Sequence, residues 1–447
     1  MIKTFNLISL GCPKNLVDSE VMYGLLEQHG WSARNDPADA ALLLVNTCGF
    51  IQPAVEESIE EILQLLQFKQ SNPKTKVVVT GCLVQRYRNK LEQELPEVDL
   101  FIGTEGVGRI HHFLEALVTG ESSERLVLPD MYLMDASVPR SLSTPFFRAW
   151  LKITEGCDNH CSYCMIPSIR GRLRSREIGD LVHEAQILER QGVKELSLVA
   201  QDLTAYGNDL DKATDLVSFL QTLLNKTTIP WIRLMYLYPS GISDDLLELM
   251  ASNSRIVPYM DIPLQHVSDR VLSAMNRRYR HDGIVELFGR VRKYLPEVAL
   301  RTTFLVGFPG ETDDDIIQLK EFIRTQRIDH VGIFPYANEE GCPAEAYANQ
   351  IEEEIKEFRL EEVAELQSEV SAEILQKYVG KTEPVLVEGL SSETDLLLTG
   401  RTRFQAPDID GCVLINEGEA SPGDILDVEL TEAQVYDLVG RIKETEV

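Results

Sequence analysis

The 447-residue sequence lacks the long apolar segments of a membrane protein. No apolar run reaches about 18 residues, the length at which a transmembrane helix is expected. The first residues, MIKTFNLISLGC, lack the charged start, long apolar core and small-residue cleavage site of a signal peptide. We therefore expect a cytoplasmic protein with no membrane partner. In a reducing compartment, its eight cysteines are expected to be thiols, metal ligands or catalytic groups rather than a disulfide framework.

Basic residues are also scarce. The chain has 43 Lys and Arg residues against 71 Asp and Glu residues, which gives a formal net charge of -28. Because non-specific affinity for nucleic acid comes from Lys and Arg, no direct nucleic-acid partner is expected. The charge suits a basic partner. It also serves solubility alone, and the composition leaves these two interpretations open.

Three predicted strands end in a cysteine. The segments TFNLISLGC, ALLLVNTC and KVVVTGC end at Cys12, Cys48 and Cys82, and helical patterns follow the first two at 18–28 and 54–68. This alternation predicts a doubly wound α/β domain with a parallel sheet, whose ligands bind at the carboxyl ends of the strands. If the strands are neighbours, the three thiols converge on a shared metal centre. The alternative is that each cysteine is a small buried hydrophobe.

A second cysteine group lies in EGCDNHCSYCMIPSIRGRLRSR. Cys157, Cys161 and Cys164 have the spacing C-x3-C-x2-C, and no fourth cysteine is evident nearby. Iron-sulfur clusters are commonly held by four thiolates, so three would leave one iron open to bind another molecule, as catalytic metal sites do. Zinc is the alternative, with His160 as the fourth ligand, although adjacent His160 and Cys161 make tetrahedral geometry awkward.

Four arginines follow this group at alternate positions. Their positive charge would favour thiolates and a negatively charged cluster. The same spacing would also place them on one solvated face of an extended segment, and the sequence does not decide between the two. They are Arg170, Arg172, Arg174 and Arg176.

The chain then alternates between strands and helices. The strand-like segments are AWLKIT, KELSLVA, WIRLMYL, VPYMDIP, LRTTFLVG and HVGIFPY, with amphipathic helices between them, for example at 178–191 and 243–251. Six such units are too few for an eight-fold barrel and predict an open, partial (β/α)6 barrel. Barrel enzymes keep their sites just beyond the strands. The polar residues there are Glu155, Gln201, Asp202, Gln265 and His266, of which His266 alone is more typical of a core histidine.

The tail begins with a long amphipathic helix over 351–378, for which Gly380 is the expected stop. The short strands and turns beyond it predict a small, five-stranded antiparallel β-barrel. Such barrels often bind RNA, but residues 376–447 hold six Lys and Arg against fifteen Asp and Glu, a net charge of -9 that favours a basic protein ligand. Cys342 and Cys412 are isolated in the sequence, and we expect both to be structural.

These motifs, in this order, resemble the radical S-adenosylmethionine methylthiotransferases. The resemblance covers nearly the whole chain and implies an N-terminal domain (1–120), a linker (121–142), a radical S-adenosylmethionine core (143–375) and an OB-like TRAM domain (376–443). It implies that an auxiliary [4Fe-4S] cluster is held by Cys12, Cys48 and Cys82. It implies that a second [4Fe-4S] cluster, which binds S-adenosylmethionine, is held by Cys157, Cys161 and Cys164. Tyr163 occupies the aromatic position that the family places near adenine.

The segments LGCPKNLVDSE, NTCGFI and GCLVQRY look like the branch of ribosomal-protein aspartate methylthiotransferases. The transfer-RNA branch typically reads nearer YGCQMN at the first cysteine. The resemblance therefore implies methylthiolation of the β-carbon of a loop aspartate in small-subunit ribosomal protein twelve, free or on the assembling ribosome, with an electron donor as a further partner. The resemblance does not identify which side chains beyond the cluster ligands are catalytic. The alternatives are methylthiolation of a transfer-RNA adenosine by the same chemistry, and a zinc-stabilised adaptor without catalysis.

Overall fold

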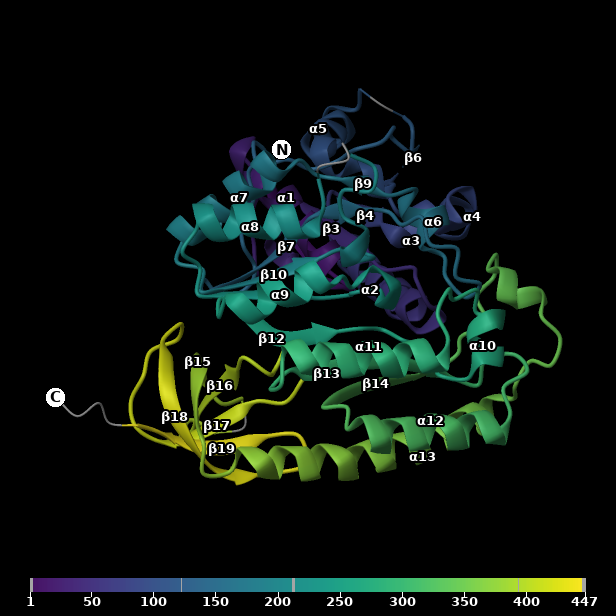
Figure 1. The fold of residues 1–447 in the computed structure, drawn as a ribbon. Coiled ribbons are helices and arrows are strands. Elements are labelled where there is room, and N and C mark those ends of the chain that lie inside the picture. The colour runs from purple at the N-terminus through teal and green to yellow at the C-terminus, as the bar shows by residue number, and fades with distance from the viewer. Residues whose placement is uncertain (1–2, 122, 211–213, 393, 444–447) are drawn as a thin grey trace.

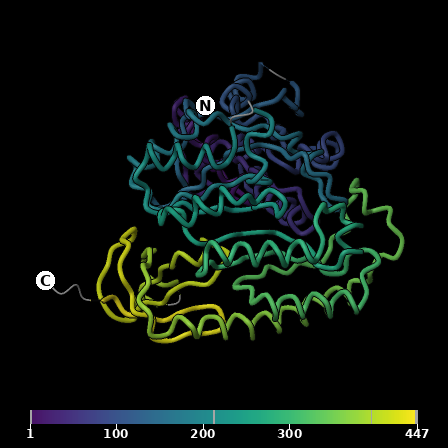
Figure 2. Tube along the Cα trace, viewed as in Figure 1, coloured from purple at the N-terminus to yellow at the C-terminus, as the bar shows by residue number. Residues whose placement is uncertain are grey.

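The computed structural model describes residues 3–121, 123–210, 214–392 and 394–443, which form three consecutive parts (Figure 1). An N-terminal α/β domain lies against a central sheet flanked by helices. A small β-barrel follows the long helix α13 (Glu353–Leu375). The chain trace shows the purple-to-blue N-terminal part and the yellow C-terminal part on different sides of the teal and green central part (Figure 2). The three fold types are those that the sequence predicts.

The N-terminal domain contains a parallel sheet in the order β2-β1-β3-β4-β5-β6. Its strands are β1 (Thr4–Ser9), β2 (Ser32–Ala33), β3 (Leu42–Thr47), β4 (Lys76–Gly81), β5 (Leu100–Ile102) and β6 (Leu126–Val127). Its helices are α1 (Pro13–Gln28), α2 (Gln52–Ser71), α3 (Cys82–Tyr87), α4 (Asn89–Glu94) and α5 (Ile110–Thr119), with 3-10 helices η1 (Pro37–Asp39) and η2 (Thr104–Arg109).

Helices cover both faces of this sheet. Leu42 and Leu44 of β3 share a core with side chains of α1 and α5. Leu43 and Val45 share the other core with side chains of α2 and α3. Because successive strand residues point to opposite faces, a strand that is covered on both sides is apolar throughout. The predicted doubly wound domain is therefore confirmed.

The central part contains a parallel sheet in the order β7-β10-β11-β12-β13-β14, with β7 and β14 at its edges. Its strands are β7 (Arg148–Lys152), β10 (Glu195–Val199), β11 (Trp231–Leu234), β12 (Ile256–Asp261), β13 (Ala299–Val306) and β14 (His330–Pro335). The helices that flank it are α7 (Ile178–Arg190), α8 (Leu216–Lys226), α9 (Asp244–Ser252), α10 (Asp269–Ala274), α11 (His281–Tyr294) and α12 (Asp313–Gln326). The short elements in its loops are β8 (Thr154–Glu155), α6 (Ile166–Arg170), β9 (Arg174–Ser175), η3 (Leu203–Ala205), η4 (Pro239–Gly241) and η5 (Pro343–Ala346). The predicted open barrel of six strand-helix units is confirmed.

The inner face of the central sheet is covered by the other two parts of the chain. Trp150 and Trp231 share one buried core with Val21 of α1 and with Phe404 of the C-terminal part. The outer face, represented by Leu151, packs in a separate core with the flanking helices. Docking of the N-terminal and C-terminal domains therefore removes from water the apolar surface that an open barrel leaves exposed.

The C-terminal part is a closed barrel in the order β15-β16-β17-β19-β18. Its strands are β15 (Thr382–Leu390), β16 (Leu398–Thr402), β17 (Val413–Glu417), β18 (Ile425–Ala433) and β19 (Leu438–Ile442). Four strand pairings are antiparallel and the fifth, β17 with β19, is parallel. An alternating pattern predicts a strand but not the direction of its pairing, so the sequence did not reveal the parallel pair.

The long helix that precedes this barrel is α13, which a 3-10 turn, η6 (Gln376–Tyr378), extends. Gly380 follows with φ 83°, a conformation that favours glycine, so the predicted helix stop is confirmed. Although α13 has 23 residues, it is rich in charge. Within the described part of the chain, no helix is both long and apolar enough to cross a membrane.

The segment between the first two domains is held by a buried group of charges. The guanidinium of Arg140 donates to Glu20 of α1 and to Glu184 of α7, both at 2.6 Å, and all three side chains are buried. Glu20 also accepts from the backbone and hydroxyl of Ser143 at 2.8 Å. Because buried charges are tolerated only when paired, this group fixes α1 against α7.

Candidate active site

Cys12, Cys48 and Cys82 lie at one edge of the N-terminal sheet. They follow β1, β3 and β4, and β3 is the hydrogen-bonded neighbour of both other strands. In the strand pairing, Ser9 of β1 lies opposite Asn46 of β3. The last residues of β3 and β4, Thr47 and Gly81, also lie opposite each other. The three turns therefore begin at the same level, as the prediction of a shared centre requires.

Glycines let these turns approach each other. Gly11 has φ 86°, and a methyl group on it would lie 2.7 Å from Cβ and 3.1 Å from Sγ of Cys48. A methyl group on Gly49 would lie 2.8 Å from the backbone of Leu83, the residue after Cys82. Only glycine permits such contacts, so the glycines bring the three cysteine turns together.

Burial holds the thiols of Cys48 and Cys82 protonated in the absence of a metal. Burial raises the pKa of Cys82 to about 12, against the opposing charge of Arg170. Burial also raises the pKa of Cys48, and the neighbouring Cys12 acts in the same direction. Cys82 is buried, and Cys12 and Cys48 are partly buried. Because a bound metal cation deprotonates coordinating thiols, this arrangement of three thiols fits a metal centre that forms with proton release.

The second cysteine group lies between β8 and α6, beyond the carboxyl end of β7. The backbone N–H of Asn159 donates to Sγ of Cys157 at 3.4 Å, and that of Ile166 donates to Sγ of Cys164 at 3.5 Å. Hydrogen bonds to cysteine sulfur favour the thiolates of an iron-sulfur cluster. Burial raises the pKa of Cys164 to about 12 and also raises the pKa of Cys157, so these two thiols are protonated without a metal.

Neither cysteine group has the geometry of a single-ion site. Among the described residues, no three His, Cys, Asp or Glu side chains are arranged to hold one metal ion. Zinc requires ligands at about 2.0–2.3 Å from one point, and the described residues show no such set around His160. A four-iron cluster places its thiolates around a larger body of iron and sulfide. The donor type, three cysteine thiols in each group, fits an iron-sulfur cluster.

Arg170 connects the two cysteine groups. It lies at the end of α6, after Cys164, and its Nε donates to Sγ of Cys82 at 3.3 Å. Its Nη1 lies 2.7 Å from Asp18 of α1 and 3.4 Å from Glu155 of β8. All these side chains are buried. The Arg170 side chain therefore contacts Cys82 of the first cysteine group and strand β8, which leads into the second group.

The arginines do not form one solvated face, so that interpretation is wrong. Arg170 and Arg176 are buried, and Arg174 is partly buried and donates to Glu105 at 2.8 Å. Only Arg172 of the four is well exposed. The reason is that β9 turns back to pair with β8, and Arg170, Arg174 and Arg176 form ion pairs with carboxylates.

Glu155 is ionised inside this network. Burial acts to raise the pKa of its carboxyl, but Lys152 at 2.8 Å and Arg170 hold that pKa at about 2. Nε2 of Gln201 donates to Glu155 at 3.4 Å. Asp202 accepts from Nδ2 of Asn159 at 2.7 Å. The predicted polar residues after β7 and β10 therefore surround the second cysteine loop.

Gln265 and His266 lie after β12 and have a structural setting. Gln265 has φ 69°. His266 is fully buried, and its Nδ1 accepts two backbone N–H groups at 2.9 Å. This is the environment that we expect for a core histidine.

Tyr163 lies between Cys161 and Cys164 and packs beside a buried apolar cluster that includes Met275. The guanidinium of Arg277 lies 5.8 Å from the centre of its ring. Burial raises the pKa of Tyr163 well above its ordinary value, so the phenol is neutral. The ring is held firmly beside the second cysteine group, and its role near adenine stays a prediction.

The sequence did not indicate that the loop after β14 reaches the first cysteine group. Glu339 on this loop forms an ion pair with Arg86 of α3 at 2.8 Å and accepts from the backbone of Gln52 at 2.6 Å. Cys342 shares a small buried cluster with Cys82 and Met165, so it is not isolated in space. These contacts join segments far apart in the chain, and no motif marks them.

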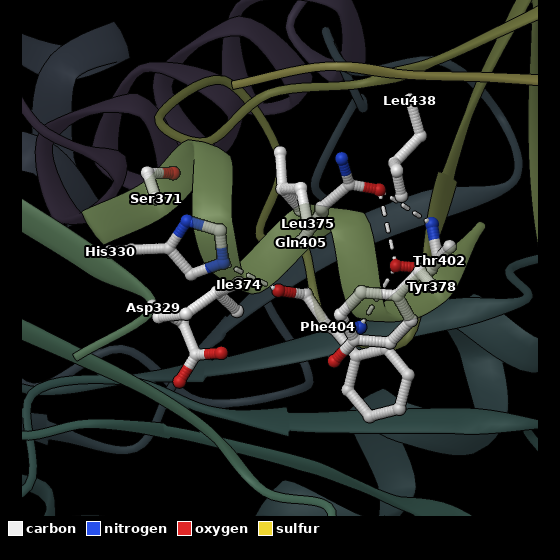
Figure 3. A pocket seen from close by; sticks show the side chains of 10 residues that line it. All are labelled: Asp329, His330, Ser371, Ile374, Leu375, Tyr378, Thr402, Phe404, Gln405 and Leu438. Carbon is white, nitrogen blue, oxygen red and sulfur yellow. Dashed lines mark hydrogen bonds between the residues drawn. The ribbon is translucent and has the colours of Figure 1, made fainter. Parts of the chain in front are cut away.

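A small cavity lies away from the cysteines, between α13, β14 and the C-terminal barrel (Figure 3). Its volume is about 10 Å³, close to the space that one water molecule needs. His330 at its edge shares a hydrogen bond of 2.8 Å with the carbonyl of Phe404. The cavity belongs to the contact between two domains and adds nothing to the candidate active site.

Three family models match the chain. Residues 4–103 match the "Uncharacterized protein family UPF0004", residues 151–323 match the "Radical SAM superfamily", and residues 379–442 match the "TRAM domain". The order of the matches follows the three parts of the fold.

Curated relatives match the chain over almost its whole length. The ribosomal protein uS12 methylthiotransferase RimO of Desulfotalea psychrophila is 58% identical over 442 residues, which cover 99% of this chain and 100% of that protein. The protein of the same name from Myxococcus xanthus is 47% identical over 443 residues, which cover 99% of this chain and 92% of that protein.

Solved structures support the fold alone. The radical S-adenosylmethionine methyltransferase TsrM from Kitasatospora setae matches with a TM-score of 0.56 and 16% identity, over 87% of this chain and 79% of its own. The cobalamin-dependent S-adenosylmethionine radical enzyme OxsB matches with a TM-score of 0.54 and 11% identity. The match covers 82% of this chain and 56% of the OxsB chain.

Proposed function

The chain belongs to the RimO family of radical S-adenosylmethionine methylthiotransferases, and we propose that it methylthiolates the ribosomal protein uS12. The target is the β-carbon of a loop aspartate. The observation that carries this proposal is the near full-length identity to uS12 methylthiotransferases. The relatives described above are named for uS12, so the transfer-RNA alternative has no comparable support.

We propose that Cys12, Cys48 and Cys82 hold one [4Fe-4S] cluster, and that Cys157, Cys161 and Cys164 hold the other. When bound, the clusters and S-adenosylmethionine supply the radical that activates an unreactive C–H bond and the sulfur that is inserted. Two groups of three thiols with hydrogen-bonded or charge-supported sulfurs support this assignment. We also propose that Tyr163 packs beside the adenine, because its ring is fixed next to the second group.

The protein's own residues orient the two cysteine groups. Arg170, Asp18 and Glu155 form a buried ion network that fixes α1 against the loop of the second group. Arg86 and Glu339 fix the turns of the first group from the other side. Arg170 also donates to Sγ of Cys82, so the buried ion network links the two groups.

We propose that the domains extend over 1–120, 143–375 and 376–443, joined by 121–142. The family matches at 4–103, 151–323 and 379–442 lie inside these limits and support them. Strand β6 at 126–127 pairs with β5 at the edge of the first sheet, so part of the linking segment is folded onto the N-terminal domain. We propose that the acidic C-terminal barrel contacts the basic substrate protein.

We further propose that the enzyme works in the cytoplasm, on uS12 that is free or on the assembling ribosome, with a one-electron donor as partner. None of its eight cysteines, all of which lie in the described part of the chain, forms a disulfide, which fits a reducing compartment. Net acidity fits an approach to a basic protein. Because cleavage of S-adenosylmethionine consumes an electron, a donor protein has to dock within reach of the second cysteine group.

The test is an anaerobic reaction of reconstituted enzyme with uS12, S-adenosylmethionine and a reductant. We expect intact-protein mass spectrometry to show one methylthio group on uS12, placed on the loop aspartate by fragmentation. A transfer RNA that carries the target adenosine is the matched substrate control. Modification of that RNA with unmodified uS12 would contradict the proposal.

A further inference from the structure

Lys14 lies where the N-terminal and central domains face each other. It is in the first turn of α1, two residues after Cys12, and is 9% exposed. Its Nζ lies 3.4 Å from the carbonyl oxygen of Ala200 and 3.9 Å from the centre of the Tyr236 ring. Ala200 follows β10 and Tyr236 follows β11. The ammonium therefore sits between the cysteine edge of one sheet and the carboxyl edge of the other.

This ammonium lacks the partner that a buried lysine normally has. An ammonium has three N–H donors, and the contact with Ala200 is longer than a normal hydrogen bond. Lys152 and Lys356, also buried, each form an ion pair with a carboxylate at 2.8 Å and 2.6 Å. Among the described residues, no carboxylate lies within 4.0 Å of Nζ of Lys14. Burying an ammonium without a carboxylate partner costs free energy. The setting of Lys14 therefore indicates a binding place for an anion.

The residue opposite Lys14 is held in a strained conformation. Tyr236 has φ 61°, which is uncommon for a residue with a side chain. Its backbone N–H donates to Asp261 at 3.0 Å, and Asp261 pairs with Arg301 at 3.0 Å. Such strain persists only where the surroundings impose it, and it gathers at functional sites. The buried network therefore fixes the tyrosine ring against the ammonium.

We propose that Lys14 binds the side-chain carboxylate of the uS12 aspartate that is modified. The inference rests on the proposed function, in which the substrate presents a carboxylate that is bonded directly to the carbon that reacts. An ammonium beside Cys12 would place that carbon near the first cysteine group, which is where the sulfur is expected. The other carboxylate in the reaction, that of S-adenosylmethionine, is expected at the second cysteine group, away from Cys12. Lys14 is then the residue that selects an aspartate.

The test is a double-mutant cycle of equilibrium binding, measured anaerobically with the reconstituted enzyme. The enzyme is used as wild type and as Lys14→Met, and uS12 is used with its target aspartate or with asparagine in that place. Wild-type enzyme is expected to prefer the aspartate form about ten-fold or more, because hydrogen bonds to charged groups are strong. Lys14→Met, which keeps the side-chain length, is expected to bind both forms equally.

Two control variants separate recognition from folding. Lys356→Met removes another buried lysine that donates to a backbone carbonyl, at 2.9 Å, and contacts a tyrosine ring. It is expected to lower the melting temperature and keep the preference for aspartate. Lys14→Arg keeps the charge and is expected to restore a preference that Lys14→Met loses.

Three outcomes would overturn the inference. The first is a Lys14→Met enzyme that still prefers aspartate by the wild-type factor, which would make Lys14 a contact between domains only. The second is an unchanged preference with weakened binding of S-adenosylmethionine, which would assign Lys14 to the carboxylate of the cofactor. The third is a wild-type enzyme that modifies uS12 but does not discriminate between the two forms. Failure of the wild-type enzyme to modify uS12 at all would instead overturn the proposed function, and the inference with it.

Discussion

Nε of Arg170 lies 3.3 Å from Sγ of Cys82, across the boundary between the central part and the N-terminal domain. Arg170 follows the last cysteine of one group, and Cys82 is the last cysteine of the other. The same guanidinium pairs with Asp18 of α1 at 2.7 Å. The two cysteine groups therefore form one assembly, and docking of the domains is part of building the site.

Replacing Arg170 is expected to damage both stability and the first cysteine group. Arg170→Met leaves Asp18 and Glu155 with one cation fewer and Cys82 without its donor. Breaking a buried ion network in this way costs about 3–5 kcal/mol. We expect a lower melting temperature and less bound iron after anaerobic reconstitution, measured by calorimetry and iron analysis. Arg172→Met is the control, because that side chain is exposed and is expected to change neither quantity. Wild-type stability and iron content in Arg170→Met would contradict the account.

The two cysteine groups are expected to fail in different ways. Cys161→Ala removes a proposed ligand of the cluster that binds S-adenosylmethionine, so both 5'-deoxyadenosine and methylthiolated uS12 should disappear. Cys48→Ala should still yield 5'-deoxyadenosine but no inserted sulfur. Chromatography of the small molecules and mass spectrometry of uS12 measure the two products. Cys412→Ala, in the C-terminal barrel, is the control and should keep both. Full product from Cys48→Ala would refute the auxiliary role of the first group.

The ion pair between Arg86 and Glu339 is expected to keep the first cysteine group closed. Both side chains are 4% exposed, and Glu339→Gln removes the charge while keeping the shape. Faster hydrogen exchange in α3 and a lower yield of methylthiolated uS12 should follow, because the turns after Cys48 and Cys82 lose their clamp. Glu340→Gln is a matched control, since its side chain is 71% exposed. Equal exchange in the two variants would show that this ion pair does not hold the turns.

The contact between the central sheet and the C-terminal barrel is expected to weaken in acid. Glu195 is fully buried and pairs with Arg233 at 2.7 Å and Arg401 at 2.6 Å. Burial acts to raise the pKa of its carboxyl, but the two arginines hold it at about 2, below the ordinary value of 4.5. A pKa that folding lowers stabilises the protein fully above the unfolded value, and this contribution is lost as the pH falls toward the folded value.

The acid effect can be measured by unfolding between about pH 5 and pH 3, where Glu195 is expected to account for a loss of about 2 kcal/mol. Glu195→Gln should be less stable at neutral pH and should lose less stability over that interval. Glu419→Gln, an exposed residue of the same charge type, should follow the wild type. The account is wrong on this point if Glu195→Gln and the wild type show the same dependence on pH.

The cysteine groups and the three fold types could be predicted because they depend on local pattern. Apolar strand patterns that lead into Cys12, Cys48 and Cys82 place these cysteines at the carboxyl edge of a parallel sheet. The contacts of Arg170 were only half predictable, since alternate spacing does not reveal which side of a segment is buried. Arg172 is exposed while Arg170 is buried, because the chain turns between them and only the Arg170 side chain lies against α1.

Contacts between domains could not be predicted from the sequence. Glu339 and Arg86 are distant in the chain, and their pairing depends on how the loop after β14 meets α3. Cys342 appeared isolated for the same reason, although it lies in a buried cluster with Cys82. The parallel pairing of β17 with β19 depends on barrel closure, which a period-two pattern does not encode.

The most direct test of the central claim is the mass of uS12 from cells with and without the gene for this chain. Cells that carry the gene are expected to contain uS12 with one methylthio group on its loop aspartate. Cells that lack it are expected to contain unmodified uS12, and the gene with Cys161→Ala should not restore the modification. Unchanged uS12 together with loss of a methylthio group from a transfer-RNA adenosine would contradict the proposed substrate.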